Sequence, residues 1–292
     1  MKIVITGGEG QLAADLLESL ARHDVVALSR DRLDIANADA IETVFAREHP
    51  DVIVNTAAFH RVDQCEAEPE QSFLVNAAAP QRLARACDRH GATLVHFSTD
   101  YVFDGRKTSP YHETDAVNPL SVYGASKAAG EMAIRSTTER HLIVRTTGVF
   151  GIAGVRSRHG NFVETMLRLA GKGDPMFVVA DQTLTPTYGH DLAGAVRDLL
   201  EAEVHGTIHV TGGGECSWYE FAGAILRLSS SSTTVSPVMQ NDRPTPARRP
   251  AYSVLAHDTL KSRGLAEPRH WEEALQEYLS RRTEAIVAHS SA

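Results

Sequence analysis

The sequence of 292 residues carries 29 lysine and arginine residues against 37 aspartate and glutamate residues, which gives a formal net charge of −8. Such a balance offers no basic surface to follow a phosphate backbone, so we expect no nucleic-acid partner. A chain of this length buries a core without disulfide or metal staples, and no apolar run approaches the roughly 20 residues that span a bilayer.

Short β-branched runs alternate with stretches whose apolar residues recur at helical spacing. The runs are apolar on both faces, which is typical of a parallel sheet buried between two layers of helices. We therefore predict a doubly wound α/β fold of the Rossmann type, with six strands at residues 2–6, 24–28, 51–55, 92–98, 141–147 and 206–212.

The second half of the chain reads differently, because its loops are richer in glycine, proline and serine and its clear strands are fewer. We predict a dinucleotide-binding domain over residues 1–150 and a smaller, mainly substrate-binding C-terminal lobe over residues 151–292. The helix and strand expected within residues 187–212 are predicted to return to the first domain.

The sequence opens with a strand, a glycine-rich turn and an amphipathic helix, in that order. Gly7 and Gly10 leave room for backbone N–H groups to approach a pyrophosphate at the start of the helix, where the helix dipole favours negative charge. Ala13 stands where a third glycine is usual, and a methyl group is tolerable there. This order indicates a dinucleotide site rather than a plain turn.

The residues after the second predicted strand bear on the choice of dinucleotide. A carboxylate at this point binds the ribose of NAD, whereas an arginine accommodates the 2′-phosphate of NADP. Arg30 precedes the first carboxylate, Asp31. The order favours NADPH over NADH, although a solvated turn would read the same way.

Three residues provide the groups that carbonyl reduction needs. Thr99 ends the fourth predicted strand, Tyr123 lies at the start of a later helix, and Lys127 follows one turn on. Hydride delivery creates an alkoxide, which calls for a proton donor and a second hydrogen-bond donor. Lowering the pKa of a phenol by about three units needs roughly 4 kcal/mol, and an ammonium about 5 Å away supplies roughly 3 kcal/mol. We predict these three residues to be catalytic, with Lys127 lowering the pKa of Tyr123.

Nine motifs place the chain near a known family. They are TGGEGQL, NTAAFHRVDQCE, VNAAAPQRLA, FSTDYVFDG, VYGASKAAGE, VRTTGVFG, NFVETMLRLA, DQTLTPTYGHDLA and TPARRPAYSVL. In order and spacing they resemble the dTDP-4-dehydrorhamnose reductase family of extended short-chain dehydrogenases/reductases, over nearly the whole chain. The resemblance implies reduction, with NADPH, of the 4-keto group of a dTDP-linked 6-deoxyhexose, as in dTDP-L-rhamnose or related deoxysugar biosynthesis.

The resemblance also implies residue roles. With the glycine turn and Arg30, the expected cofactor-binding residues are Gly7, Gly10, Gln11, Leu12, Arg30, Asp34, Ile35, Ala57, Ala58, Phe59, Tyr123 and Lys127. Among these, Asp34 and Ile35 would lie beside the adenine, and Ala58 and Phe59 beside the nicotinamide. The expected substrate-binding residues are His60, Thr99, Asp100, Tyr123 and Gly148. Asp100 has a plain alternative as a turn-forming residue.

Two positions depart from the family pattern near the expected sugar pocket. Gly148 stands where a tryptophan is usual, so a large apolar contact surface is missing. His60 stands where a small hydroxyl residue is common. These changes put the identity of the sugar in doubt, but not the class of reaction.

Some family members hold a divalent ion at a dimer contact. Asp15 and Asp191 match two of its ligands, but the third position is Arg281, so we predict no metal and leave open a monomer or a homodimer. The C-terminal lobe offers Arg243, Arg248 and Arg249, which are suited to a diphosphate or to structural pairing.

Other functions on this fold remain to be separated. A nucleotide-sugar dehydratase typically has a glutamate where this chain has Tyr101, and a 4-epimerase with tightly held NAD suits Arg30 less well. A non-catalytic, NADP-binding regulatory subunit would be favoured by loss of Tyr123 and Lys127, and both are present. Three scattered cysteines and a start without a leader favour a cytoplasmic location with no membrane segment.

Overall fold

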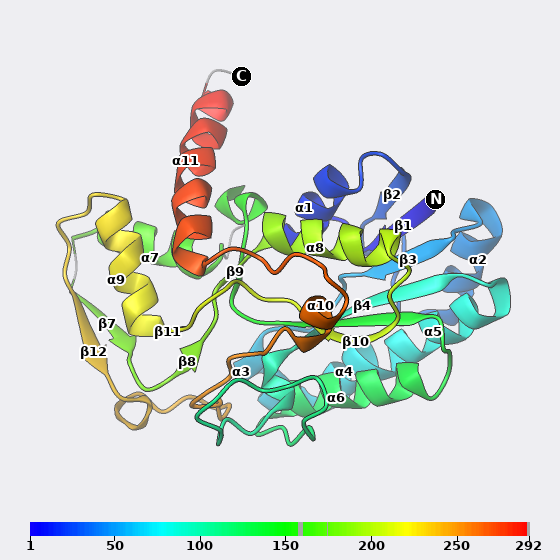
Figure 1. Ribbon diagram of the computed structural model, residues 1–292, viewed down its shortest axis with the longest axis horizontal. Helices are drawn as coiled ribbons and strands as arrows, with labels where there is room; N and C mark the ends of the chain where they lie inside the picture. The colour runs from blue at the N-terminus through cyan, green and yellow to red at the C-terminus, as the bar shows by residue number, and fades with distance from the viewer. Residues whose placement is uncertain (157–159, 174, 291–292) are drawn as a thin grey trace.

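The computed structural model describes residues 1–156, 160–173 and 175–290. Its main body is a parallel sheet in the order β10-β5-β4-β3-β1-β2, with helices on both faces (Figure 1). The strands are β1 (Lys2–Thr6), β2 (Asp24–Leu28), β3 (Val52–Asn55), β4 (Thr93–Thr99), β5 (His141–Thr146) and β10 (Gly206–His209). The predicted doubly wound fold and its six strands are confirmed.

Successive side chains of each strand enter two different cores, because they point to opposite faces of the sheet. Ile3 and Ile5 pack with Leu16 and Leu192 on one face, whereas Val4 packs in the core of the other. The first face is covered by α1 (Gln11–Ser19) and α8 (Gly189–Glu201). The second is covered by α2 (Ala38–Glu48), α5 (Ala79–His90) and α6 (Val122–Arg135) (Figure 1).

The segment between β3 and α5 forms short helices beside α6. These are α3 (Val62–Ala67), α4 (Pro69–Phe73) and a π-helical turn, η1 (Leu74–Ala78). Helix α6 begins at Ser121, whose hydroxyl accepts a hydrogen bond from the Gly124 N–H at 3.2 Å, a common N-cap arrangement. The same start of α6 carries Tyr123 and Lys127 toward the end of β4.

The rest of the chain folds as a smaller lobe at one end of the sheet, with α11 rising from it (Figure 1). Its helices are α7 (Phe162–Ala170), α9 (Trp218–Leu228) and α11 (Trp271–Ser290), and its short strands are β6 (Val149–Phe150), β7 (Met176–Val179), β8 (Thr183–Leu184), β9 (Thr187–Tyr188), β11 (Cys216–Ser217) and β12 (Val235–Val238). Helix α10 (Asp258–Ser262) instead packs on β10, and its Leu260 belongs to the core of the main sheet. Aromatic residues fill the core of the smaller lobe, with Phe150, Phe221 and Tyr278 fully enclosed. In the described ranges no helix is long and apolar enough to cross a membrane.

Candidate active site

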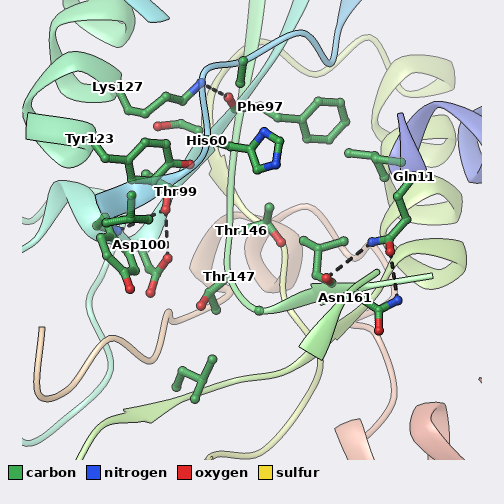
Figure 2. Close-up of a pocket in the computed structure, with 18 of the residues that line it drawn as sticks. Gln11, His60, Phe97, Thr99, Asp100, Tyr123, Lys127, Thr146, Thr147 and Asn161 are labelled. Atoms are coloured by element: carbon green, nitrogen blue, oxygen red, sulfur yellow. Dashed lines mark hydrogen bonds between the residues drawn. The ribbon is translucent and has the colours of Figure 1, made fainter. Parts of the chain in front are cut away.

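A cavity of about 610 Å³ lies between the carboxyl ends of the sheet strands and the smaller lobe. Its walls combine ten residues that the sequence nominated: Gly10, Gln11, Leu12, Ala58, His60, Thr99, Asp100, Tyr123, Lys127 and Gly148. Figure 2 shows His60 extending into this space from one wall, with Tyr123 and Thr99 on one side and Gln11 on the other. The other nominated residues are not among its lining residues: Gly7, Arg30, Asp34, Ile35, Ala57 and Phe59.

The glycine-rich turn has the tight geometry that its sequence predicts. Gly7 adopts φ +68°, and a Cβ there would come within 2.9 Å of Thr56 Oγ1 and 3.0 Å of the Ala57 nitrogen. The Gly10 N–H donates to the Gly7 carbonyl at 2.8 Å, and Gly10 is the N-cap residue of α1. Because Gly7, Gly8 and Gly10 carry no side chains, the first N–H groups of α1 are open to an anion, although the turn also carries Glu9 in the cavity wall.

The three residues expected near the adenosine part of the dinucleotide, Arg30, Asp34 and Ile35, differ in their exposure and contacts. The Arg30 guanidinium is 78% exposed and lies 3.7 Å from Asp34 Oδ2, so it is free to meet a further anion. Asp34 Oδ1 accepts a hydrogen bond from the Ala36 N–H at 2.9 Å. The side chain of Ile35 is 3% exposed and belongs to the core under α2. Its side chain therefore anchors the loop instead of facing the cavity.

Thr99 and Asp100 are buried polar residues at the end of β4, next to the partly buried Tyr123. The Thr99 hydroxyl donates to Asp100 Oδ1 at 2.9 Å and accepts from the Tyr101 N–H at 3.2 Å. Burial raises the pKa of Asp100, while hydrogen bonds from Ser253, Thr99 and Thr147 oppose the rise. The carboxyl is thus tied into the fold as well as facing the cavity.

The electrostatics of Tyr123 differ from the sequence prediction. Burial raises the pKa of the phenol, a hydrogen bond with Thr99 lowers it, and the nearby Asp100 raises it again. Lys127 Nζ donates to the Phe97 carbonyl at 2.6 Å and lies 3.0 Å from His96 Nε2. The amine is therefore already engaged beneath the site, and the expected lowering of the phenol pKa by Lys127 is not found.

Asn76, which sequence reasoning gave no role, holds the backbone of Phe59, one of the residues that the sequence predicts beside the nicotinamide. Its Oδ1 accepts from the Phe59 N–H at 2.8 Å, and its Nδ2 donates to the Phe59 carbonyl at 2.9 Å and to Ser126 Oγ at 3.0 Å. Asn76 is fully buried in η1. A polar residue within the apolar run VNAAAP was the available signal, because a buried amide must find partners.

Gly148 lacks a side chain for a conformational reason. Its φ is +55°, and a Cβ would meet Leu184 Cδ1 at 2.9 Å, so Leu184 occupies the space beside it. Trp218 lines the cavity from the smaller lobe and packs against Phe162 with ring centroids 4.5 Å apart. An aromatic surface is thus present in the cavity, from a part of the chain where the sequence gave no indication of it.

The candidate anion-binding and metal-binding residues outside the cavity are mostly paired. Arg249 Nη2 binds Asp63 Oδ2 at 2.9 Å, and Arg243 lies over the Phe177 ring. Both oxygens of Asp191 accept from Arg269 at 2.9 Å. Arg281 binds both oxygens of Glu18 at 3.0 Å. Among the described residues, no cluster of three His, Cys, Asp or Glu side chains could hold a metal ion.

The chain is similar to characterised proteins along its whole length. The model of a family described as RmlD substrate binding domain matches residues 1–284. The spore coat polysaccharide biosynthesis protein SpsK of Bacillus subtilis (strain 168) is 43% identical over 286 residues, which is 97% of this chain and 99% of SpsK. A dTDP-4-dehydrorhamnose reductase of Aggregatibacter actinomycetemcomitans is 39% identical over 94% of this chain and 97% of its own.

A solved structure gives the same picture. The dTDP-4-dehydrorhamnose reductase of Bacillus anthracis str. Ames, determined in complex with NADP, is 36% identical and superimposes with a TM-score of 0.92. The match covers 96% of this chain and 100% of that one. Fold and sequence are therefore shared over both the sheet and the smaller lobe.

Proposed function

The chain belongs to the dTDP-4-dehydrorhamnose reductase family, and on that premise we propose that it reduces the 4-keto group of a dTDP-linked 6-deoxyhexose with NADPH. The observation that carries the proposal is a single cavity lined both by the glycine-rich turn and by Thr99, Tyr123 and Lys127. A dinucleotide bound at the glycine-rich turn can bring its nicotinamide ring to the Tyr123 phenol only if the turn and the phenol face the same cavity.

The residues present fit the dinucleotide. The bare turn of Gly7 and Gly10 gives a pyrophosphate access to the N-terminus of α1, where the helix dipole favours negative charge. Arg30 supplies an exposed cation for the 2′-phosphate that distinguishes NADPH from NADH. Ala58 lines the cavity where the nicotinamide would lie, and Asn76 holds the backbone of the neighbouring Phe59.

The roles of the reactive residues follow from their positions. NADPH supplies the hydride when it is bound. Tyr123 holds a proton on its phenol oxygen and gives it to the carbonyl oxygen as negative charge develops there. Thr99 lies beside the phenol and orients it, and Asp100 fixes the Thr99 hydroxyl. Lys127, which lines the same cavity, would hold the nicotinamide ribose, and its amine would bring positive charge to this end of the site when it is protonated.

The two parts of the chain divide the work. In this proposal residues 1–150, with 187–212 returning to them, bind the dinucleotide, and the remainder of 151–292 is mainly the sugar-binding lobe, with Trp218 as its aromatic contact. We place the protein in the cytoplasm, since Cys65, Cys87 and Cys216 are free and buried thiols.

Product analysis tests the proposal. The purified chain is mixed with NADPH and, separately, with dTDP-4-dehydrorhamnose and dTDP-4-keto-6-deoxy-D-glucose. We expect oxidation of NADPH with one of them and a 6-deoxyhexose product whose hydroxyl configuration at the reduced carbon identifies the pathway. NADPH binding without turnover across the panel would instead support the regulatory, non-catalytic role.

A further inference from the structure

Four polar side chains form a continuous row beneath the candidate active site. Thr6, Asn55 and His96 are register partners on β1, β3 and β4, and Lys127 reaches the row from α6. Thr6 is 0%, Asn55 1%, His96 1% and Lys127 2% exposed. Because bulk water is excluded, each hydrogen-bond donor in the row needs an acceptor inside it.

The direction of the row is fixed at Asn55. The Ala57 N–H, which can only donate, points to Asn55 Oδ1 at 3.2 Å, and the Thr6 hydroxyl donates to the same oxygen at 2.6 Å. The amide nitrogen Nδ2 therefore faces His96 Nδ1 at 3.0 Å and donates to it. His96 Nδ1 must then be the ring nitrogen without a proton.

This arrangement leaves the proton of His96 on Nε2. Burial lowers the pKa of His96 well below its ordinary value, so the ring is neutral and carries one N–H. That N–H points at Lys127 Nζ, which is 3.0 Å away and also donates to the Phe97 carbonyl at 2.6 Å. A neutral amine satisfies all of these groups, whereas an ammonium has no lone pair to accept from Nε2–H.

Burial and the neighbouring carboxylate have opposite effects on the pKa of Lys127. Burial lowers its pKa to about 8, and Glu131 on the next turn of α6 raises it. Glu131 is itself bound by Arg145 from β5 at 2.7 Å and by Arg135 at 3.3 Å.

The other neighbouring elements bring two further kinds of group. Toward Tyr123 they present Asp100 and Tyr101 from η2 (Asp100–Val102) and Cys65 from α3. From α4 and η1 they present the uncharged Ser72 and Asn76, both bonded to Ser126. His96 is thus the neighbour whose proton position bears directly on the amine.

We propose that His96 is a positioning residue for Lys127: Asn55 fixes which ring nitrogen of His96 carries the proton, and the ring then fixes where the amine lies and which protonation state the site favours. Its effect on turnover rests on the proposed function, but the proton position in the row does not. The row therefore connects the core of the sheet to Lys127, a residue in the wall of the candidate active site.

Nitrogen NMR of the whole protein tests the proton position directly. In ¹⁵N-labelled protein, the His96 signals, assigned by their loss in His96→Gln, are expected to show the Nε2–H tautomer. In Asn55→Asp the new carboxylate oxygen accepts from Nδ1, so the tautomer should switch to Nδ1–H. Finding Nδ1–H in the unaltered protein, or no switch in the variant, would overturn the proposal.

The pH profile of 4-keto sugar reduction tests the consequence for Lys127. Both Asn55→Asp and His96→Gln present an acceptor to the ammonium, so the pH above which activity falls should rise by about one unit or more. His141→Gln is the matched control and should not shift the pH above which activity falls. His141 is a buried histidine on the neighbouring strand β5, and its ring is hydrogen-bonded to the Thr138 carbonyl. Equal loss at every pH without a shift would reduce His96 to a structural role and refute the inference.

The two proposals fail in different ways. If no 4-keto sugar is reduced, the proposed function falls, and the His96 tautomer together with the titration of the Lys127 nitrogen still decides the inference. If reduction is found but the tautomer is Nδ1–H, the function stands and the positioning role falls.

Discussion

At the residue scale, Tyr123 decides whether this site is a catalyst or a binding pocket. Its ring packs edge-on against Tyr101 with centroids 5.7 Å apart, a contact that phenylalanine would keep. We expect Tyr123→Phe to lower kcat by roughly 10²- to 10⁴-fold, because only the proton donor is lost. NADPH oxidation measures the rate and equilibrium titration the cofactor affinity, which should stay the same. Undiminished turnover would exclude Tyr123 as the acid.

Arg30 carries the argument for NADPH over NADH. Since its guanidinium is exposed and, in the described part of the chain, paired only with Asp34 at 3.7 Å, Arg30→Ala should leave the fold intact. Loss of one charged hydrogen bond should weaken NADPH binding by roughly 10-fold or more, with NADH binding little changed. Dissociation constants for both dinucleotides give the comparison. Equal weakening of NADPH and NADH binding would show that Arg30 does not recognise the 2′-phosphate.

Asp15 makes a prediction about stability. Burial raises its pKa from 3.8 to about 7, and its Oδ2 has no hydrogen-bond partner in the described structure. Between these two pH values the folded state holds a proton that the unfolded chain has lost, so the free energy of unfolding falls as pH rises from about 4 to about 7.

Replacing Asp15 should therefore remove part of this pH dependence. Asp15→Asn is expected to stabilise the protein by roughly 3 kcal/mol at pH 8 and very little at pH 4, measured by denaturant unfolding. Asp198→Asn alters a half-exposed carboxylate and serves as the control. A stabilisation that is the same at both pH values would contradict the assignment.

At the scale of elements, helix α6 is placed by its glycines. A Cβ at Gly130 would lie 2.1 Å from the Asn76 carbonyl oxygen, so the helix lies against η1 at a distance that only glycine allows. This close approach brings Ser126 within reach of Asn76 and puts Lys127 over the end of β4. The contact between α6 and η1 thus positions both the loop that contains Phe59 and the row beneath Tyr123.

Adding one methyl group should disturb this contact. We expect Gly130→Ala to destabilise the protein by about 1–3 kcal/mol and to lower activity as well, because α6 must move away from η1. Gly194→Ala, in the interior of α8, should stabilise by about 1 kcal/mol through helix propensity, because in the described structure no atom outside the adjacent backbone of α8 lies within 4 Å of the new Cβ. Thermal unfolding of the pair measures the contrast, and equal effects would disprove the packing argument.

At the scale of the whole molecule, Asp63 joins the two parts of the chain. Its carboxylate accepts from the Ala247 N–H at 3.2 Å and from Arg249 at 2.9 Å, and this segment leads to Pro250 and Ser253 in the cavity wall. The contact therefore holds one wall of the site against α3.

Removing this contact should weaken binding of the sugar nucleotide more than binding of NADPH. For Asp63→Ala we expect the KM for the sugar nucleotide to rise roughly 5-fold, since a half-exposed pair is worth about 1 kcal/mol, with NADPH affinity preserved. Steady-state kinetics and cofactor titration separate the two. Arg227→Ala, which breaks an ion pair with Glu272 within the lobe, is the control and should change neither. A matching loss of NADPH affinity would show that the contact serves the whole fold.

The sequence by itself determined the six strands, the glycine turn and the positions of Thr99, Tyr123 and Lys127. These features depend on local patterns: apolar runs with both faces buried, glycines next to a strand, and chemistry placed at a strand end. Such patterns are complete within a few residues and are therefore readable without the fold.

Only the tertiary structure decided what surrounds those residues. Asn76, His96 and Trp218 reach the site through contacts between segments far apart in the chain, and their residue types alone give no direction. The pKa of Tyr123 likewise depends on burial by the whole fold, which raises it, and on contacts with Thr99 and Asp100. Gly148 was read as a missing aromatic, whereas its positive φ and the neighbouring Leu184 explain the glycine. Hydrogen-bond partners, burial and free space belong to the assembled molecule, because each is defined by atoms that the sequence does not place together.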